Sequence, residues 1–152
     1  MENRPPSQHE LPTHVVEVLV GGQAHVVATS DADGHPITTI MTWVVALDRH
    51  RLAMCVDHRS RTWRNMTERP AVAVEILAEH LILGVKGTAR VVREKMETPP
   101  FSSALVVVDI LEVRDHSHPG TTFRGPSYVF AEDKQHRHAL EKRVYAELRS
   151  AK

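Results

Sequence analysis

Short runs of apolar and β-branched residues, separated by turn signals, dominate the first 115 positions of the chain. Asp33-Gly34 lies between two such runs, and an Asp-Gly pair in that setting is typical of a β-hairpin. Val, Ile and Thr together make up 36 of the 152 residues, and such side chains pack well on a pleated sheet. We predict six strands, over residues 24–30, 37–47, 51–57, 71–77, 81–93 and 104–115.

Three helices are predicted around these strands. The first covers residues 14–20 and ends at Gly21-Gly22, because a glycine pair is a good helix stop. A second short helix follows Ser60, a favourable N-cap, and ends before Pro70. The third lies in residues 132–151, where Leu140, Val144 and Leu148 form a narrow i,i+4 apolar stripe that we expect to dock on the strands. Docking against a partner subunit is the alternative.

The order of elements favours an antiparallel sheet that closes into a barrel. Short turns join the strands, no strand–helix–strand alternation occurs, and closure removes exposed strand edges. The length fits one domain over residues 1–152. Within it we expect the barrel at about 10–115, a loop at 116–131 and the C-terminal helix at 132–151.

Charge and composition exclude several classes of protein. Nineteen Lys and Arg balance nineteen Asp and Glu, so nothing suggests a nucleic-acid or anionic-membrane partner. No apolar run approaches the roughly 18 residues that a membrane span needs. Cys55 is the only cysteine, which leaves no intrachain disulfide and no multi-thiolate metal site. We expect a cytoplasmic protein without a bound metal, in which Cys55 is a buried apolar thiol.

The segment from Asp57 to Asn65 is the most informative for chemistry. It places Ser60, Arg61 and Thr62 at the first turn of a helix that follows a strand. Free N–H groups and the positive end of the helix dipole suit a phosphate there, and arginine adds charge-assisted hydrogen bonds. Locally, a solvated basic turn behind an N-cap explains the same residues equally well.

The order of features from Ala24 to Arg93 resembles the pyridoxamine 5′-phosphate oxidase-like family of FMN-binding split β-barrels. The resemblance is carried by the turn Asp31-Ala32-Asp33-Gly34-His35-Pro36, the strand residues 37–45, the helix Ser60-Arg61 … Arg64-Asn65-Met66 … Pro70, and the strand residues 84–91. It covers about 70 residues in order, and no single motif within it is highly specific.

The resemblance implies a homodimer that binds FMN in a groove between subunits and acts as an oxidoreductase on a small molecule. The phosphate would meet the Ser60-Arg61 turn, and the flavin ring would lie along the second strand. The implied cofactor-binding residues are Thr39, Ile40, Met41, Thr42, Val56, Asp57, Arg59, Ser60, Arg61 and Thr62. The resemblance assigns no catalytic side chain.

The chain also departs from the family pattern. Thr62 stands where family members carry a lysine, Thr39 and Val44 where the oxidase itself has cations, and Ile82 where it has a glutamine. Losing two charge-assisted hydrogen bonds costs roughly 1.5–3 kcal/mol each, which weakens FMN binding. Pyridoxamine 5′-phosphate oxidase activity is therefore not expected, and Arg59 is a candidate substitute for the missing lysine.

Two alternatives follow from these departures. The barrel could bind haem or a deazaflavin instead, with His116 or His118 as the haem ligand, because a His-x-His pair in extended chain points both rings to one side. Otherwise it is a non-enzymatic ligand-binding or dimerisation module whose flavin groove has degenerated.

Overall fold

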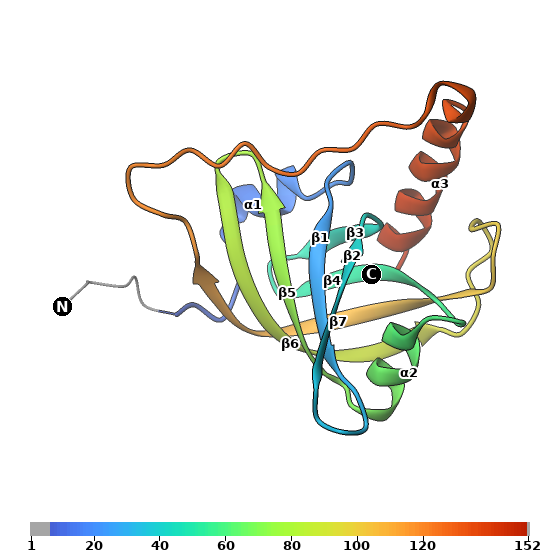
Figure 1. Cartoon of the computed structure of the whole chain (residues 1–152), viewed down its shortest axis with the longest axis horizontal. Coiled ribbons are helices and arrows are strands. Elements are labelled where there is room, and N and C mark those ends of the chain that lie inside the picture. Colours follow the sequence, from blue (N-terminus) through green and yellow to red (C-terminus); the bar gives the residue numbers. More distant parts are fainter. Residues whose placement is uncertain (1–6, 152) are drawn as a thin grey trace.

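The structure is a computed structural model that describes residues 7–151, and one antiparallel sheet with three flanking α-helices dominates it (Figure 1). The strand order is β2-β1-β5-β6-β7-β4-β3. The mainly β prediction is confirmed, with seven strands in place of six. Their bounds are β1 His25–Ser30, β2 Pro36–Met41, β3 Val44–Asp48, β4 Arg51–Asp57, β5 Ala71–Ala78, β6 Leu81–Arg93 and β7 Ser103–Asp115.

The extra strand arises because the run predicted as one strand over 37–47 is divided at Thr42-Trp43. β2 pairs with β1, where Met41 lies opposite His25, while β3 pairs with β4, where Val44 lies opposite Met54. Consecutive strands thus become the two opposite edges of the sheet. A continuous run of apolar and β-branched residues cannot reveal this change of partner, because every part of it is suited to a strand.

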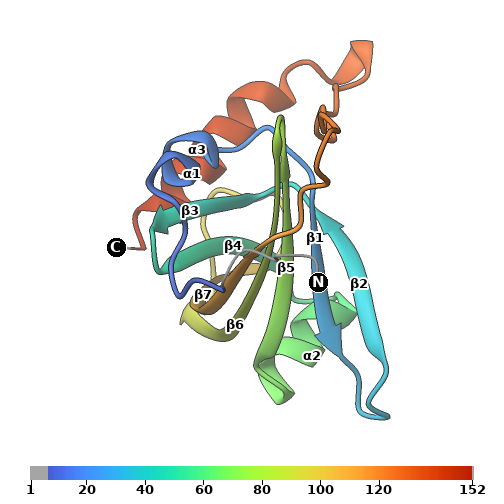
Figure 2. The ribbon, with the colours of Figure 1, turned by 90° about the vertical axis from the view of Figure 1, so that its left-hand side faces the viewer.

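The sheet curls strongly, so that its faces become an inside and an outside (Figure 2). The long strands β6 and β7 have register shifts between Lys86 and Gly87 and between Val91 and Arg93, and such irregularities bend a strand. Gly87 is required at the first shift, because a Cβ there would lie 2.6 Å from the Asp109 carbonyl oxygen.

Two clusters of buried side chains stabilise this arrangement. The first fills the inside of the curled sheet and includes Leu52, Met54 and Ile76, all fully buried. The second lies between the outer face of β3, β4 and β7 and the C-terminal helix, where Val144 and Leu148 are fully buried. The predicted docking of the Leu140, Val144 and Leu148 stripe on the strands is confirmed.

The helices occupy the predicted places with shifted ends. They are α1 Thr13–Val18, α2 Arg61–Glu68 and α3 Arg137–Arg149, with a single 3-10 turn, η1 Glu132–Lys134, ahead of α3. The tail is therefore not one continuous helix over 132–151. None of the helices within residues 7–151 is long and apolar enough to cross a membrane.

Candidate functional site

A cavity of about 210 Å³ opens where the β2–β3 link, the end of β4 and the start of α2 meet. Eight of the ten residues that the sequence marked as cofactor-binding line it, so the fold gathers them from three separate segments. They are Thr39, Ile40, Met41, Thr42, Val56, Asp57, Ser60 and Thr62.

The β2 side of the cavity is an edge of the sheet. β2 pairs only with β1, so among the described residues its outer backbone edge has no strand partner. Side chains along β2 are exposed or half-buried throughout, and Ile40 is 63% exposed. This strand therefore offers unpaired backbone N–H and C=O groups beside the cavity.

The α2 side of the cavity is a helix N-terminus with available donors. Ser60 caps it as predicted: its hydroxyl accepts from the Trp63 N–H at 3.0 Å and donates to the Asp57 carbonyl at 2.7 Å. A helix start leaves several N–H groups without an intrahelical partner, and the cap satisfies that of Trp63. The N–H groups of Arg61 and Thr62, one and two residues after Ser60, remain available. The positive end of the helix dipole lies at the same place, which suits an anion.

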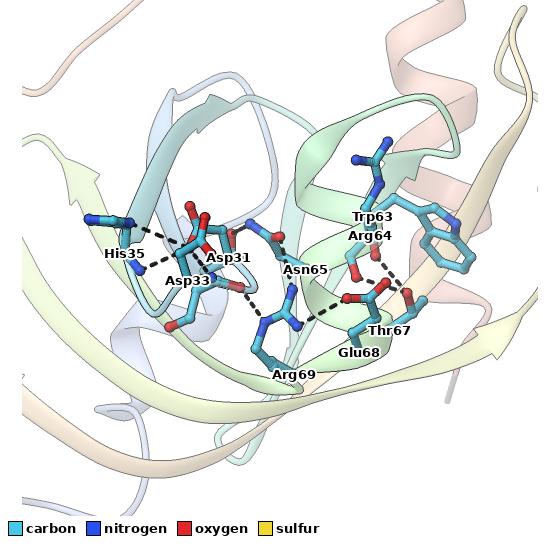
Figure 3. Close-up of polar contacts among 11 residues, drawn as sticks. Asp31, Asp33, His35, Trp63, Arg64, Asn65, Thr67, Glu68 and Arg69 are labelled. Carbon is cyan, nitrogen blue, oxygen red and sulfur yellow. Dashed lines mark hydrogen bonds and ion pairs between the residues drawn. The ribbon is translucent and has the colours of Figure 1, made fainter.

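The other end of α2 is fastened to the β1–β2 hairpin, which fixes the helix relative to β2 (Figure 3). Buried Asn65 donates through Nδ2 to the Thr29 hydroxyl at 3.0 Å, and Arg69 donates through Nε to the Ser30 carbonyl at 2.8 Å. In the adjoining turn, Asp31 Oδ1 accepts from the N–H groups of Asp33 and His35, each at 2.9 Å. The Asp31 side chain therefore has a structural part in the turn.

The two arginines of the predicted site lie beside the cavity without lining it. Arg59 is 78% exposed and pairs with Asp57 through Nε at 3.2 Å and Nη2 at 3.0 Å. These hydrogen bonds from Arg59 hold the pKa of Asp57 below its usual value. Within residues 7–151 no ion pair engages Arg61, which is exposed, so its guanidinium, unlike that of Arg59, is available to an anion.

The four departures from the family pattern do not all lie at the cavity. Thr39 and Thr62 line it, whereas Val44 is fully buried in the inner cluster and Ile82 is half-buried at the start of β6. Only two positions of the cavity wall therefore carry a threonine where a cation was expected.

Three further residues line the cavity that are not among the ten predicted cofactor-binding residues, namely Trp43, Cys55 and Phe101. Trp43 and Cys55 directly adjoin predicted residues along the chain, so extending each segment by one position would have found them. Phe101 follows the Pro99-Pro100 break and carries no local signal. Burial raises the pKa of the Cys55 thiol to about 11, which keeps it neutral and agrees with its expected role as an apolar side chain.

A second cluster lies away from this cavity, on the outer face of β5, β6 and β7. His116 Nδ1 lies 2.7 Å from a carboxylate oxygen of Glu75, and the imidazole rests directly on Gly84. A Cβ on Gly84 would lie 2.1 Å from the ring, so the glycine makes room for it. Glu75 and His116 line a shallow cavity of about 190 Å³ together with Lys86 and Arg114.

A curled antiparallel sheet whose two edge strands are consecutive in the chain, with a cavity at the start of a short helix, defines the split-barrel class of proteins. The family described as pyridoxamine 5′-phosphate oxidase matches residues 11–117, and the chain belongs to this family. The resemblance seen in the sequence is thereby confirmed. No curated protein matches the chain.

Solved structures share the fold at low identity. A Lactobacillus delbrueckii protein assigned to the same oxidase is 23% identical, with a TM-score of 0.58 over 70% of this chain and 94% of its own. A haem-binding protein of Mycobacterium smegmatis is 14% identical, with a TM-score of 0.57 over 72% and 55%. An FMN-binding protein of Syntrophomonas wolfei is 9% identical, with a TM-score of 0.54 over 70% and 84%. Identities this low establish a common fold alone.

Proposed function

We propose that this chain binds FMN in the cavity between β2, β4 and α2, and that it acts as an oxidoreductase. The observation that carries the proposal is the meeting of eight predicted residues at one cavity beside an N-terminal helix turn. Membership of the oxidase family and the fold shared with an FMN-binding protein support the same assignment.

The two ends of FMN suit the two sides of this cavity. The phosphate is accommodated by the N–H groups of Arg61 and Thr62 and by the Arg61 guanidinium, which combine the helix dipole with a charge-assisted bond. The flavin ring suits the β2 side, where unpaired backbone groups meet its polar edge and Ile40 and Met41 meet its faces. Bound there, FMN supplies hydride transfer, while the protein orients it.

A homodimer is part of the proposal. The cavity holds about 210 Å³, whereas ligand pockets run to roughly 300–1,000 Å³, so one protomer provides part of a site. The exposed edge strand β2, with Ile40 near its end, is the surface that a second copy would cover. Light scattering on the purified protein tests this, and a mass of 17.1 kDa for the particle would exclude the dimer.

The first test of FMN binding is a titration followed by flavin absorbance, with riboflavin as the ligand that lacks the phosphate. Arg61→Ala should weaken FMN binding by about 10- to 100-fold, the value of a hydrogen bond to a charged group. It should leave riboflavin binding unchanged. Arg64→Ala is the matched control, because Arg64 is exposed on the same helix and its replacement by alanine removes the same charge. Equal FMN affinity in both variants would refute the phosphate site.

The oxidoreductase assignment needs a separate measurement. Anaerobic addition of a nicotinamide donor to the FMN-loaded protein should bleach the flavin absorbance, and a second acceptor should restore it. A flavin that stays oxidised with every donor class would favour a non-catalytic flavin carrier. A deazaflavin presents a similar tricyclic ring, and its titration in parallel decides between the two cofactors.

Haem is a second candidate because of the Glu75–His116 pair. A carboxylate on one imidazole nitrogen orients the ring and raises the basicity of the other nitrogen, as is usual for histidines that bind iron. With Nδ1 held by Glu75, Nε2 of His116 is the coordinating atom. A Soret band of added hemin that sharpens and shifts with the wild-type and His118→Ala proteins, but not with His116→Ala, would support this function. A hemin spectrum that is the same with and without the protein would exclude it.

A further inference from the structure

The C-terminal helix α3 contacts the wall of the candidate FMN cavity at several points. Tyr145 donates its hydroxyl proton to the Thr42 carbonyl at 3.0 Å, and Glu141 Oε2 accepts from the indole N–H of Trp43 at 3.1 Å. Thr42 and Trp43 both line the cavity. The family match ends at residue 117, so α3 and these contacts lie outside the matched region.

A third contact of α3 involves the segment that carries Phe101, another residue of the cavity wall. The loop between β6 and β7, which carries Phe101, lies beside α3 (Figures 1 and 2). Glu147 accepts from the N–H groups of Glu97 at 3.0 Å and Thr98 at 2.9 Å in this loop. Burial opposes ionisation of Glu147, yet these N–H groups hold its pKa below the usual value, so it remains a carboxylate.

The aromatic rings of Trp43 and Phe101, on the two segments that α3 contacts, form one surface. The rings of Trp43 and Phe101 are parallel to within 3°, with centroids 5.7 Å apart, which is an offset stack. Both line the cavity. Glu141 is itself buried, and a buried carboxylate is costly unless donors compensate it. The indole N–H of Trp43 is such a donor, so the position of the indole is strongly defined.

We propose that Trp43 and Phe101 form a stacking wall for the flavin ring, and that Glu141 and Glu147 of α3 are its positioning residues. This rests on the proposed function, since it assigns the ring end of the same site. A planar aromatic ligand gains most from a wall whose rings are already fixed, because no side-chain freedom is then lost on binding.

The positioning part of the proposal is tested without any ligand. The chain has two tryptophans, so in a Trp63→Phe background the fluorescence reports Trp43 alone. Glu141→Leu should lower the anisotropy of Trp43 and shift its emission to longer wavelength, because an indole that has lost its acceptor moves more freely and turns towards water. Glu141→Gln keeps an oxygen acceptor and should restore both values. Identical spectra for the Leu and Gln variants would overturn the positioning role.

The stacking part is tested by titrating FMN and riboflavin into the same proteins. Phe101→Leu and Glu141→Leu should weaken both ligands by the same factor, roughly tenfold for loss of an aromatic contact. Arg61→Ala should weaken FMN alone. If Arg61→Ala has that effect while the wall variants bind both ligands normally, the wall is refuted and the FMN site stands. If the wild-type protein binds neither ligand, the proposed function fails and the flavin wall with it.

Discussion

Single buried residues give this fold a dependence on pH, and His25 is the strongest case. Its side chain is fully buried, Nδ1 accepts from the Leu77 N–H at 3.1 Å, and Nε2 has no partner among the described residues. Burial lowers the pKa of His25 to about 4 from the ordinary value of 6.5. The unfolded chain therefore binds the proton more readily, and folding stability contributed by neutral His25 is lost as pH falls from 6.5 towards 4.

His25→Gln isolates this contribution, because glutamine keeps an acceptor for the Leu77 N–H and does not titrate. Between pH 7 and pH 4.5 the free energy of unfolding of the wild-type protein should fall by about 2 to 3 kcal/mol more than that of the variant. Urea unfolding at a series of pH values measures the difference. Parallel pH dependences in the two proteins would show that His25 does not carry the effect.

At the scale of elements, the attachment of α2 to the β1–β2 hairpin decides where the helix N-terminus lies. Asn65→Ala leaves the buried Thr29 hydroxyl without its donor and should reduce the free energy of unfolding by about 1–3 kcal/mol. Arg64→Ala, on the exposed face of the same helix, should cost no more than about 0.5 kcal/mol. Chemical denaturation compares the two, and equal losses would contradict the anchoring role of Asn65.

The docking of α3 depends on a glycine at the end of α1. Gly21 has a φ of +116°, and a Cβ on it would lie 2.2 Å from the ring of Tyr145. Gly22 also has positive φ, but a Cβ there meets nothing within 4 Å. Gly22→Ala therefore incurs only backbone strain of roughly 1–2 kcal/mol, while Gly21→Ala adds a steric cost of about 1–3 kcal/mol. Thermal unfolding should rank the variants in this order; equal melting temperatures would contradict it.

At the scale of the whole molecule, the exposed edge of the sheet is the feature that a partner would change. Ile40, the residue before the last of β2, is 63% exposed. If a second copy covers this strand, Ile40→Lys buries a charge at the interface and should convert the dimer to a 17.1 kDa monomer. Light scattering measures the mass, with Leu111→Lys as the control, because Leu111 is an exposed apolar residue on a different strand, β7. If the Ile40→Lys protein remains dimeric, the interface does not include this part of β2.

The sequence by itself determined most of the helices and strands, and it indicated which segments of the chain line the cavity. Apolar patterns predicted strands at 51–57 and 81–93 that the structure reproduces, and Ser60 predicted the cap of α2, because these features depend on local side-chain patterning and backbone preferences. It also indicated the family, and the order of Thr39–Thr42, Val56–Asp57 and Ser60–Thr62 marked the segments that line the cavity.

Only the tertiary structure decided how those segments meet. It divided the run at 37–47 into two edge strands, because hydrogen-bond partners are chosen across the sheet and not along the chain. It brought Phe101 and Glu141 to the wall beside Trp43, from positions 58 and 98 residues further along the chain. Contacts at such separations have no local signature, since they depend on where the curled sheet places each strand end.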